Sequence, residues 1–398
     1  MEKTICELFA GVGGFRLGLE RSSSQWNTVW FSQWEPNKTK QWAHDCYVTH
    51  WGDVDQYTGI DISLVPKQTI PNHNLLVGGF PCQDYSVARP LTNSNGIQGK
   101  KGVLWWEIRN VLLAKQSPFV LLENVDRLLK SPSTQRGRDF AIMLACFAEL
   151  DYSVEWRVIN AADYGAAQRR RRVFIFAYKN NTNYARSLRY PPQDIIRKHG
   201  LFAKAFPIKQ LEAPVFTTLD YSDIPNISSS FSFSFENAGF MRRGELSTIK
   251  AIPLQEQPTP LSAILESNVP EKYYIGNNLE KWNYLKGAKK IQRVSKGGHE
   301  YIFSEGAIAF PDPIHLPART ILTSESSINR STHIILDQET ERFRLLTPVE
   351  AERIQGFCDD WTNTGMPEKF RYFVMGNALV VPMVTRMGRV INEIFDKE

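Results

Sequence analysis

The segment VGGFPCQDYS (residues 77–86) places a cysteine, Cys82, directly after an apolar run that ends in two glycines. Ligands of open α/β sheets bind beyond the carboxyl ends of the strands, so a thiol at this position can act as a nucleophile. An ordinary thiol pKa of about 8.5 leaves little thiolate at neutral pH, so such a site must lower it. Because most unpaired cysteines only fill cores, Cys82 by itself leaves both interpretations open.

A carboxylate occupies the equivalent place in a second apolar run, PFVLLENV (118–125), which Glu123 closes. Burial at the end of a strand raises the pKa of a carboxyl group, and Glu123 could then donate a proton. The alternative is a helix-capping or salt-bridged carboxylate.

Four consecutive arginines follow in QRRRRVFIF (168–176). In an extended chain the side chains alternate between faces, which puts Gln168, Arg170 and Arg172 on one side and Arg169 and Arg171 on the other. Two arginines could therefore enter a site while two face solvent or phosphates. A plain solvated charge run is the alternative.

The turn FAGVGG (9–14) is rich in glycine and lies between an apolar strand and an amphipathic helix. Missing side chains at Gly11 and Gly13 let a nucleotide-like cofactor approach the backbone. Glu35 ends the next strand, where an acid can bind two ribose hydroxyls. Arg16 stands where the dinucleotide fingerprint requires glycine, which weakens a dehydrogenase interpretation, and a tight turn with a surface acid stays open.

The elements that must position these residues follow an α/β rhythm. Strands are expected to end near Phe9 and Glu35, and further strands over 74–79, 118–125 and twice within 152–178. Their apolarity is continuous rather than alternating, so we expect strands that are buried on both faces of a parallel sheet.

From about residue 181 to 340 this rhythm disappears, which predicts a second, irregular domain. It contains SSSFSFSFEN (228–237), which suits a strand with one buried face, and a basic, aromatic-rich stretch over 271–301. Order returns in the tail, where Thr347 is expected to cap a helix together with Glu350. A last helix over 375–395 is expected to pack on the first domain through its apolar positions Leu379, Val380, Met383, Val384, Met387, Val390 and Ile391.

Composition narrows the class of protein. The 398-residue chain is 42% hydrophobic, has no apolar run of membrane-spanning length, and does not begin like a secretory signal, so we expect a cytoplasmic location. Its five cysteines lack the spacing of a zinc site or a disulfide framework, so no metal is expected. The net charge of +5 favours a polyanionic partner.

Taken together and in order, the motifs FAGVGGF, GGFPCQDYS, ENV, QRRRRV, RLLTPVEAERIQGF and GNALVV resemble those of the cytosine-5 DNA methyltransferases, of the bacterial restriction–modification type. The resemblance implies a Rossmann-like, S-adenosylmethionine-dependent α/β domain with a mostly parallel sheet and a smaller irregular target-recognition domain. The expected boundaries are 1–185 for the catalytic domain, 186–343 for the target-recognition domain and 344–398 for a segment that returns to the catalytic domain.

The resemblance also assigns chemistry. Methyl transfer from S-adenosylmethionine would go to the 5 position of a cytosine flipped out of duplex DNA, after Cys82 adds to the 6 position. Glu123 would donate a proton to ring nitrogen 3, and Arg172 with Arg170 would hold the carbonyl oxygen of the base. The residues implied to bind the cofactor are Phe9, Gly11, Val12, Gly13, Glu35 (ribose), Asp53 (adenine), Pro81, Leu104 and Asn377. The residues implied to contact DNA are Gln83, Ser86, Gln168 and Arg169.

We therefore expect duplex DNA as the partner of a monomeric enzyme; the chain itself does not tell whether a cognate restriction endonuclease is encoded nearby. Three alternatives remain: a cytosine-5 tRNA methyltransferase, a noncatalytic DNA-binding regulator on the same fold, and a nicotinamide oxidoreductase, which Arg16 argues against. Whether Trp34 or Pro36 flanks the adenine is open, and the recognition sequence cannot be read from the chain.

Overall fold

The computed structural model describes residues 1–80, 104–276, 279–295 and 297–398. These residues form two compact units. Unit 1 comprises Met1–Tyr164, Arg170–Glu256 and Leu379–Glu398, and unit 2 comprises Gly165–Arg169 and Gln257–Ala378.

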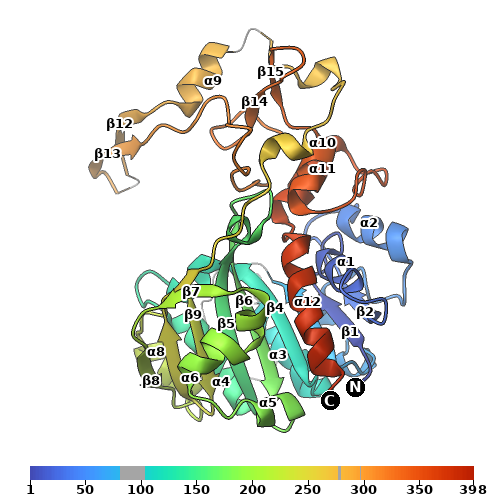
Figure 1. The fold of residues 1–398 in the computed structure, drawn as a ribbon, viewed down its shortest axis with the longest axis vertical. Helices are drawn as coiled ribbons and strands as arrows, with labels where there is room; N and C mark the ends of the chain where they lie inside the picture. Colours follow the sequence, from blue (N-terminus) through green and yellow to red (C-terminus); the bar gives the residue numbers. More distant parts are fainter. Residues whose placement is uncertain (81–103, 277–278, 296) are drawn as a thin grey trace. The chain divides into compact units, whose positions relative to one another are not determined.

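Unit 1 is built on a nine-stranded sheet with the order β2-β1-β3-β4-β6-β5-β9-β10-β8 (Figure 1). Its strands are β1 (Thr4–Leu8), β2 (Asn27–Ser32), β3 (Leu75–Gly79), β4 (Phe119–Val125), β5 (Tyr152–Asn160), β6 (Arg171–Lys179), β8 (Val215–Thr218), β9 (Ala238–Arg242) and β10 (Glu245–Ile249). A separate pair, β7 (Ile208–Leu211) and β11 (Ala251–Pro253), lies in the same unit.

The sheet contains both parallel and antiparallel pairs of strands, and its parallel strands end at one edge. The neighbours β2, β1, β3 and β4 run parallel, and every pairing from β4·β6 outward is antiparallel. Six of the nine described strands consequently point the same way, which confirms the expected α/β class with a mostly parallel sheet. Because β1 to β4 are parallel neighbours, their carboxyl ends lie at one edge.

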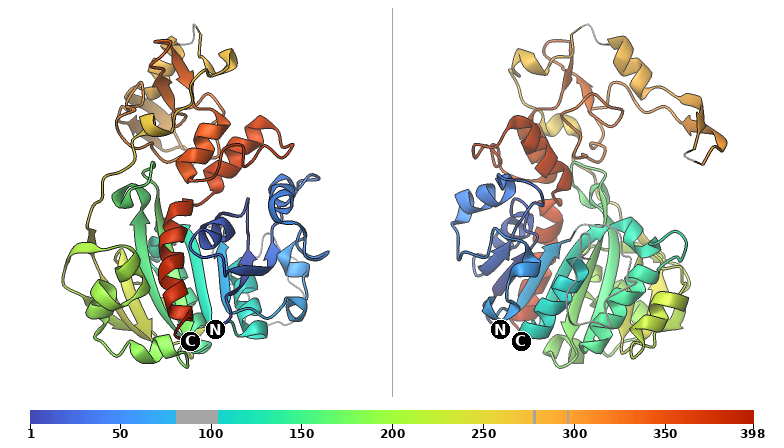
Figure 2. Two further views of the ribbon diagram at one scale, coloured as in Figure 1. Left: turned by 45° about the vertical axis from the view of Figure 1, so that its right-hand side comes forward. Right: turned by 180° about the vertical axis from the view of Figure 1, so that it is seen from behind.

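Helices cover both faces of this sheet. Figures 1 and 2 show α1 and α12 on one face and α3 and α4 on the other. The helices of unit 1 are α1 (Gly14–Glu20), α2 (Trp42–Trp51), α3 (Leu104–Lys115), α4 (Arg138–Glu149), α5 (Asn183–Ser187), α6 (Pro192–Asp194), α7 (Leu201–Ala205), α8 (Ile224–Ser230) and α12 (Val381–Phe395). α12 lies against α1 so closely that a Cβ on Gly18 would be 2.6 Å from Val384 Cβ.

The two units divide the chain differently from the expected domain boundaries. Residues 186–256, expected in the target-recognition domain, belong to unit 1, because β9 pairs with β5 and β10 and β8 continue the same sheet. Residues 344–378 belong to unit 2 rather than to unit 1. The returning segment in unit 1 starts at Leu379.

Two local expectations need correction. Residues 231–236 are not a strand, although their burial alternates as expected: Phe235 is buried, and Phe231 and Phe233 pack at the edge of the main core. The last helix is interrupted, since α11 (Glu368–Asn377) ends before Ala378 and α12 begins at Val381. The seven apolar positions expected to be buried in this segment are buried.

Unit 2 has little regular structure around a small apolar cluster. Its strands are β12 (Lys289–Val294), β13 (Glu300–Glu305), β14 (Ile334–Leu336) and β15 (Phe343–Leu345), and its helices are α9 (Leu279–Lys286), α10 (Pro348–Gln355) and α11. Ile275, Trp282 and Ile334 form the buried centre of the cluster. The expected capping box of α10 is present, with Thr347 and Glu350 bonded reciprocally.

Candidate active site at the carboxyl edge of the sheet

Glu123 lies near the carboxyl end of β4, directly opposite Gly79 of β3. A Cβ on Gly79 would be 3.4 Å from Glu123 Oε2, so the glycine leaves space beside the carboxylate. β3 leads from Gly79 and Phe80 into Pro81 and Cys82, and these last two residues, with Gln83 and Ser86, lie outside the described residues. The strand that directly precedes the cysteine motif in the sequence is thus the strand that pairs with β4 at Glu123.

Arg172 holds the Glu123 carboxylate from the neighbouring strand. Arg172 Nε is 2.9 Å from Glu123 Oε1, and both side chains are largely buried. Burial raises the pKa of Glu123, while the charges of Arg172 and Arg170 oppose that rise. The carboxyl group is thus more readily protonated than an exposed glutamate, as a proton donor requires.

Arg170 is the second cation of this group. It is almost fully buried, and burial, with a smaller effect of Arg172, lowers its guanidinium pKa to about 9. Burial alternates along 168–172 as expected for an extended chain, with Arg169 and Arg171 exposed. Arg171 Nε instead pairs with Asp126 at 3.1 Å.

Asn124 ties the end of β3 to β4 and was not among the residues predicted from the sequence. Its Nδ2 donates a hydrogen bond of 2.9 Å to the carbonyl oxygen of Phe80, two residues before Cys82. Its Oδ1 accepts from the backbone N–H of Val125 at 2.8 Å. The only signal for this role in the sequence was its place beside Glu123 in the ENV motif.

The glycine turn folds tightly between β1 and α1. Phe9, Gly11 and Gly13 have positive φ angles of 55°, 58° and 84°. A Cβ on Gly13 would lie 2.2 Å from the Trp51 ring, so glycine is required there by contact as well as by backbone conformation. Val12 is buried.

Gln33 was also missed by the sequence analysis. Its Oε1 accepts the backbone N–H of Gly11 at 2.7 Å, so the side chain fixes the turn from the end of β2. A cofactor that used this N–H would have to displace the amide.

Glu35 follows β2 and has the properties of a ligand-binding acid. The side chain is half-buried, and burial raises its pKa against a smaller opposing effect of the Ala43 backbone N–H. Its Oε2 is buried and has no hydrogen-bond partner among the described residues. A buried acceptor without a donor is costly, and a hydroxyl-bearing ligand such as the ribose of S-adenosylmethionine would satisfy it.

Three other residues expected to bind the cofactor have no feature in the described part of the structure that points to a ligand. Asp53 is exposed, and its Oδ1 accepts from the Thr58 hydroxyl at 2.6 Å and from the Val54 N–H at 2.8 Å. Leu104 begins α3 and is half-buried. Asn377 ends α11 in unit 2 and is exposed.

Gln168 does not fit the expected contact with DNA. Its side chain is fully buried in unit 2, where Nε2 donates to Gln355 Oε1 at 3.1 Å and Oε1 accepts from the Ile321 N–H at 2.9 Å. A glutamine with both polar atoms bonded inside a fold has a structural function. Its neighbour Arg169 is exposed.

Two other cysteines are poor candidates for a nucleophile. Cys6 and Cys146 are buried in the main core, and burial raises the pKa of both thiols, that of Cys146 to about 11. A thiol in such an environment stays protonated and inaccessible. Cys358 is exposed in unit 2.

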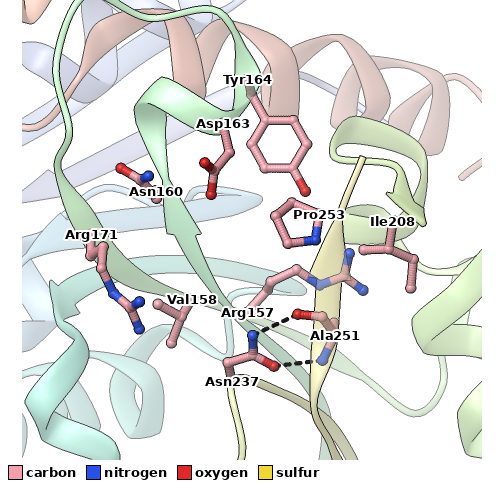
Figure 3. Close-up of a pocket in the computed structure, with 10 residues that line it drawn as sticks. All are labelled: Arg157, Val158, Asn160, Asp163, Tyr164, Arg171, Ile208, Asn237, Ala251 and Pro253. Atoms are coloured by element: carbon pink, nitrogen blue, oxygen red, sulfur yellow. Dashed lines mark hydrogen bonds between the residues drawn. The ribbon is translucent and has the colours of Figure 1, made fainter. Parts of the chain in front are cut away.

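A small pocket of about 90 Å³ in unit 1 is distinct from this group (Figure 3). Arg157 lines the pocket, and its guanidinium donates hydrogen bonds to the carbonyl oxygens of Ile196 and Phe206, at 2.5 and 3.1 Å. Asn237 bonds both backbone groups of Ala251, as Figure 3 shows. Neither Glu123 nor Arg172 is among the described residues that line it. The pocket lies between β5 and β11 and is apart from the candidate site.

Comparisons with known proteins agree with this arrangement. The family model of the C-5 cytosine-specific DNA methylases matches residues 3–393. The chain belongs to this family. It is therefore a cytosine-5 DNA methyltransferase, which implies S-adenosylmethionine as the methyl donor.

Curated relatives include type II methyltransferases of restriction–modification systems. The chain is 53% identical to M.Sau3AI of Staphylococcus aureus over 98% of this chain and 95% of that protein. It is 25% identical to M.SsoII of Shigella sonnei over 98% of this chain and 80% of that protein. M.HhaI of Haemophilus parahaemolyticus is 32% identical over 46% of this chain and 52% of its own length.

Solved structures share the fold at low sequence identity. Entamoeba histolytica methyltransferase EhMeth matches with a TM-score of 0.60 at 16% identity, covering 100% of this chain and 99% of its own. A Spodoptera frugiperda DNMT2 mutant matches with a TM-score of 0.61 at 14% identity, covering 98% and 99%. In the described part of the chain, every helix is too short or too polar to cross a bilayer.

Proposed function

We propose that the chain methylates the 5 position of a cytosine within a specific duplex DNA sequence, with Cys82 as the nucleophile and Glu123 as the proton donor. The observation that carries this proposal is the position of Glu123: a buried carboxyl group of raised pKa, held by Arg172 and facing the strand that leads into Cys82. The target base must leave the helix stack to reach such a site.

The thiolate of Cys82 adds to carbon 6 of the ring, and the electron pair of the 5,6 double bond moves toward ring nitrogen 3. Glu123 delivers a proton to that nitrogen, which makes carbon 5 nucleophilic like the carbon of an enamine. Bound S-adenosylmethionine would supply the methyl group that carbon 5 takes up, with S-adenosylhomocysteine as the product. A base, expected to be water, then removes the proton from carbon 5, Cys82 leaves as the thiolate, and ring nitrogen 3 returns its proton to Glu123.

Arg172 and Arg170 act first on the base. We assign Arg172 to the carbonyl oxygen of the cytosine and to the orientation of Glu123, with which it already pairs. Arg170 contributes charge from beneath the site, and its lowered pKa reflects the burial of two guanidinium groups close together. These cations also favour the Cys82 thiolate.

The cofactor is assigned to the carboxyl edge formed by the ends of β2, β1 and β3. Glu35 Oε2 accepts the ribose hydroxyls, Asp53 accepts from the adenine amine, and the turn formed by Phe9, Gly11, Val12 and Gly13 borders the methionine part. Pro81, Leu104 and Asn377 are proposed as further contacts of the cofactor. No metal takes part.

For DNA we assign contacts to Gln83, Ser86 and Arg169 and withdraw Gln168, because its side chain is buried and bonded within unit 2. We further propose a monomer that acts in the bacterial cytoplasm. The names of the relatives favour a cognate endonuclease encoded nearby.

A covalent trap tests the nucleophile. Duplex DNA in which 5-fluorocytosine replaces the target base is incubated with protein and S-adenosylmethionine, and the adduct is measured on a denaturing gel. Wild type and the exposed-cysteine control Cys358→Ala should both form it, and Cys82→Ala should not. Equal trapping by Cys82→Ala would refute the nucleophile, and transfer confined to tRNA would refute the substrate.

A further inference from the structure

The positive charge of the chain is concentrated in residues 281–296. This segment contains six lysine or arginine residues and no aspartate or glutamate, in a chain with 47 basic and 42 acidic side chains. Without it, the chain has 41 basic and 42 acidic side chains. A polyanionic ligand is therefore expected at this segment more than over the surface as a whole.

Residues 289–294 of the segment form β12, which pairs with β13 in a hairpin that projects from the rest of unit 2 (Figure 1). Directly opposite residues share a face of a two-stranded ribbon. One face, here called the open face, carries Lys290, Gln292 and Val294 opposite Ser304, Ile302 and Glu300. All six of these residues are exposed.

The other face of the hairpin is partly occupied by its own contacts. Ile291 and Phe303 are half-buried, and the Arg293 guanidinium lies 3.9 Å from the centre of the Phe303 ring. Lys289 Nζ is 4.7 Å from the Tyr284 ring and 3.9 Å from Glu305 Oε2. On the open face itself, Gln292 Nε2 donates a hydrogen bond of 3.1 Å to Glu300 Oε2. A base edge that binds the Gln292 amide would replace this exposed bond, and the face is otherwise exposed to a ligand.

The open face is also costly to leave uncovered. Ile302 is 70% exposed and Val294 is 63% exposed. A two-stranded hairpin by itself is marginally stable in water, so a projecting ribbon with exposed aliphatic side chains needs support elsewhere. That support comes from the root of the hairpin.

Arg330 fixes the root of both strands. Its Nη1 donates to the carbonyl oxygens of Leu285 at 3.3 Å and Gly287 at 3.1 Å, just before β12. Its Nη2 donates to the carbonyl oxygen of Gly306, just after β13. One planar guanidinium thus sets the direction in which the hairpin leaves unit 2.

A buried ion group holds the adjoining end of α9. Lys286 is 1% exposed, and its Nζ donates to the Thr332 carbonyl oxygen and lies 3.5 Å from Asp312 Oδ2. Arg319 Nε pairs with the same carboxylate at 2.6 Å. Polar contacts therefore support the hairpin where a large apolar core is missing.

We propose that the open face of the β12–β13 hairpin enters the major groove of the substrate duplex and reads its sequence, with Arg330 as the positioning residue. The inference rests on the proposed function. A major groove admits a two-stranded ribbon, and the open face offers the groups that read base edges: an amide for adenine, an ammonium for guanine and aliphatic carbon for the thymine methyl. Lys281 and Arg293, which are exposed, suit the phosphates on either side.

The test compares a recognised duplex with duplexes that differ by one base pair. The recognised sequence comes from mapping methylated cytosines in a plasmid from cells that express the wild-type protein. Gln292→Ala and Lys290→Ala should each lower kcat/KM on the recognised duplex about tenfold or more, with little change on the altered duplexes. Lys209→Ala, at an exposed lysine of β7 in unit 1, is the matched control and should change neither value.

Arg330→Gln tests the positioning role. It should raise KM on the recognised duplex about tenfold and leave kcat within about twofold, because the hairpin is misdirected while the reacting groups are unchanged. Arg330→Lys keeps the charge but lacks the planar fork that reaches carbonyl oxygens before β12 and after β13, so it should restore less than half of the lost affinity. Thermal unfolding midpoints check that each variant folds. If the Arg330 variants do not fold, Gln292→Ala and Lys290→Ala still test whether the open face reads the DNA sequence.

The outcomes separate the two proposals. Wild-type protein that methylates no duplex DNA would overturn the proposed function itself. Wild-type activity with undiminished discrimination in Gln292→Ala and Lys290→Ala would overturn the hairpin assignment alone. An oligomer that dissociates on Ile302→Ser, with discrimination unchanged, would assign the open face to self-association and also overturn it.

Discussion

The carboxyl edge of the sheet in unit 1 and the β12–β13 hairpin in unit 2 hold charged groups in opposite ways. At the sheet edge, Glu123 and Arg172 are largely buried and lie on adjacent strands whose backbones are paired along their length. On the hairpin, Lys290 and Gln292 are exposed, and the ribbon is fixed at its root by Arg330. The proposed reacting groups are thus held between paired strands of the sheet. The proposed base-reading groups lie on a ribbon that extends away from the place where it is fixed.

The energetic consequences differ as well. A buried charge has a shifted pKa and depends strongly on its partner, so substitutions at the sheet edge should have large effects. Exposed charges are screened by water and salt, so substitutions on the hairpin should alter binding and leave the free energy of unfolding nearly unchanged.

The largest effect is expected at the sheet edge from Glu123→Gln. The amide cannot deliver a proton to ring nitrogen 3, so the rate of methyl transfer should fall about 10²- to 10⁴-fold. Urea unfolding checks that the variant is folded, because Arg172 then lacks its charged partner. Single-turnover transfer from labelled S-adenosylmethionine measures the rate, with the exposed Glu245→Gln as control. A loss of less than tenfold would remove Glu123 from the mechanism.

A second large effect concerns Glu7 in β1. The side chain is fully buried, and burial raises its pKa to about 8, against the smaller opposing hydrogen bond that it accepts from the Tyr47 hydroxyl. A carboxyl group whose folded pKa is raised stabilises the fold at low pH, and this contribution disappears as the pH rises through the folded value. The wild type should therefore lose stability between about pH 5 and pH 8 relative to Glu7→Gln.

Urea unfolding at pH 5, 7 and 9 measures this difference. At pH 9, Glu7→Gln should be more stable than the wild type by on the order of 3 kcal/mol. The variant Glu2→Gln, at an exposed position in the same segment, should follow the wild type at every pH. Parallel curves for Glu7→Gln and the wild type would show that Glu7 is ionised in the folded protein without penalty.

An intermediate effect is expected at Glu35. Its Oε2 lacks a hydrogen-bond partner among the described residues, and a ribose hydroxyl would supply one. Hydrogen bonds to charged groups contribute about 1.5–3 kcal/mol, so Glu35→Gln should weaken S-adenosylmethionine about 10- to 100-fold in calorimetric titration. Glu245→Gln should bind normally. Unchanged affinity in Glu35→Gln would place the ribose elsewhere.

The same contrast explains what the sequence could predict. Strand ends at Glu35 and Glu123 follow from continuous apolar runs, and the alternation along 168–172 follows from the geometry of an extended chain. The extension of the sheet by β8, β9 and β10 could not be predicted, because pairing between distant segments leaves no local period.

Hydrogen bonds between side chains and distant segments could not be predicted from the sequence either. Gln33 fixes Gly11, Asn124 fixes Phe80, and Arg330 fixes the hairpin root, each through contacts across separate segments. Gln168 shows the reverse case: the alternation put it on the same side as Arg170, yet unit 2 buries it completely. Alternation along a strand predicts which side chains lie on the same face. Packing against other segments determines whether each of them contacts a ligand, solvent or the protein interior.

The smallest expected effect applies one substitution to both regions. Ile175 in β6 is fully buried, whereas Ile302 in β13 is 70% exposed. Ile175→Val removes a methyl group from a packed core and should cost about 0.5–1.5 kcal/mol of unfolding free energy. Ile302→Val should stay within about 0.5 kcal/mol of the wild type, because the methyl group it removes already faces water. Urea unfolding of both variants measures the contrast, and equal losses would mean that another part of the protein covers the open face before DNA is bound.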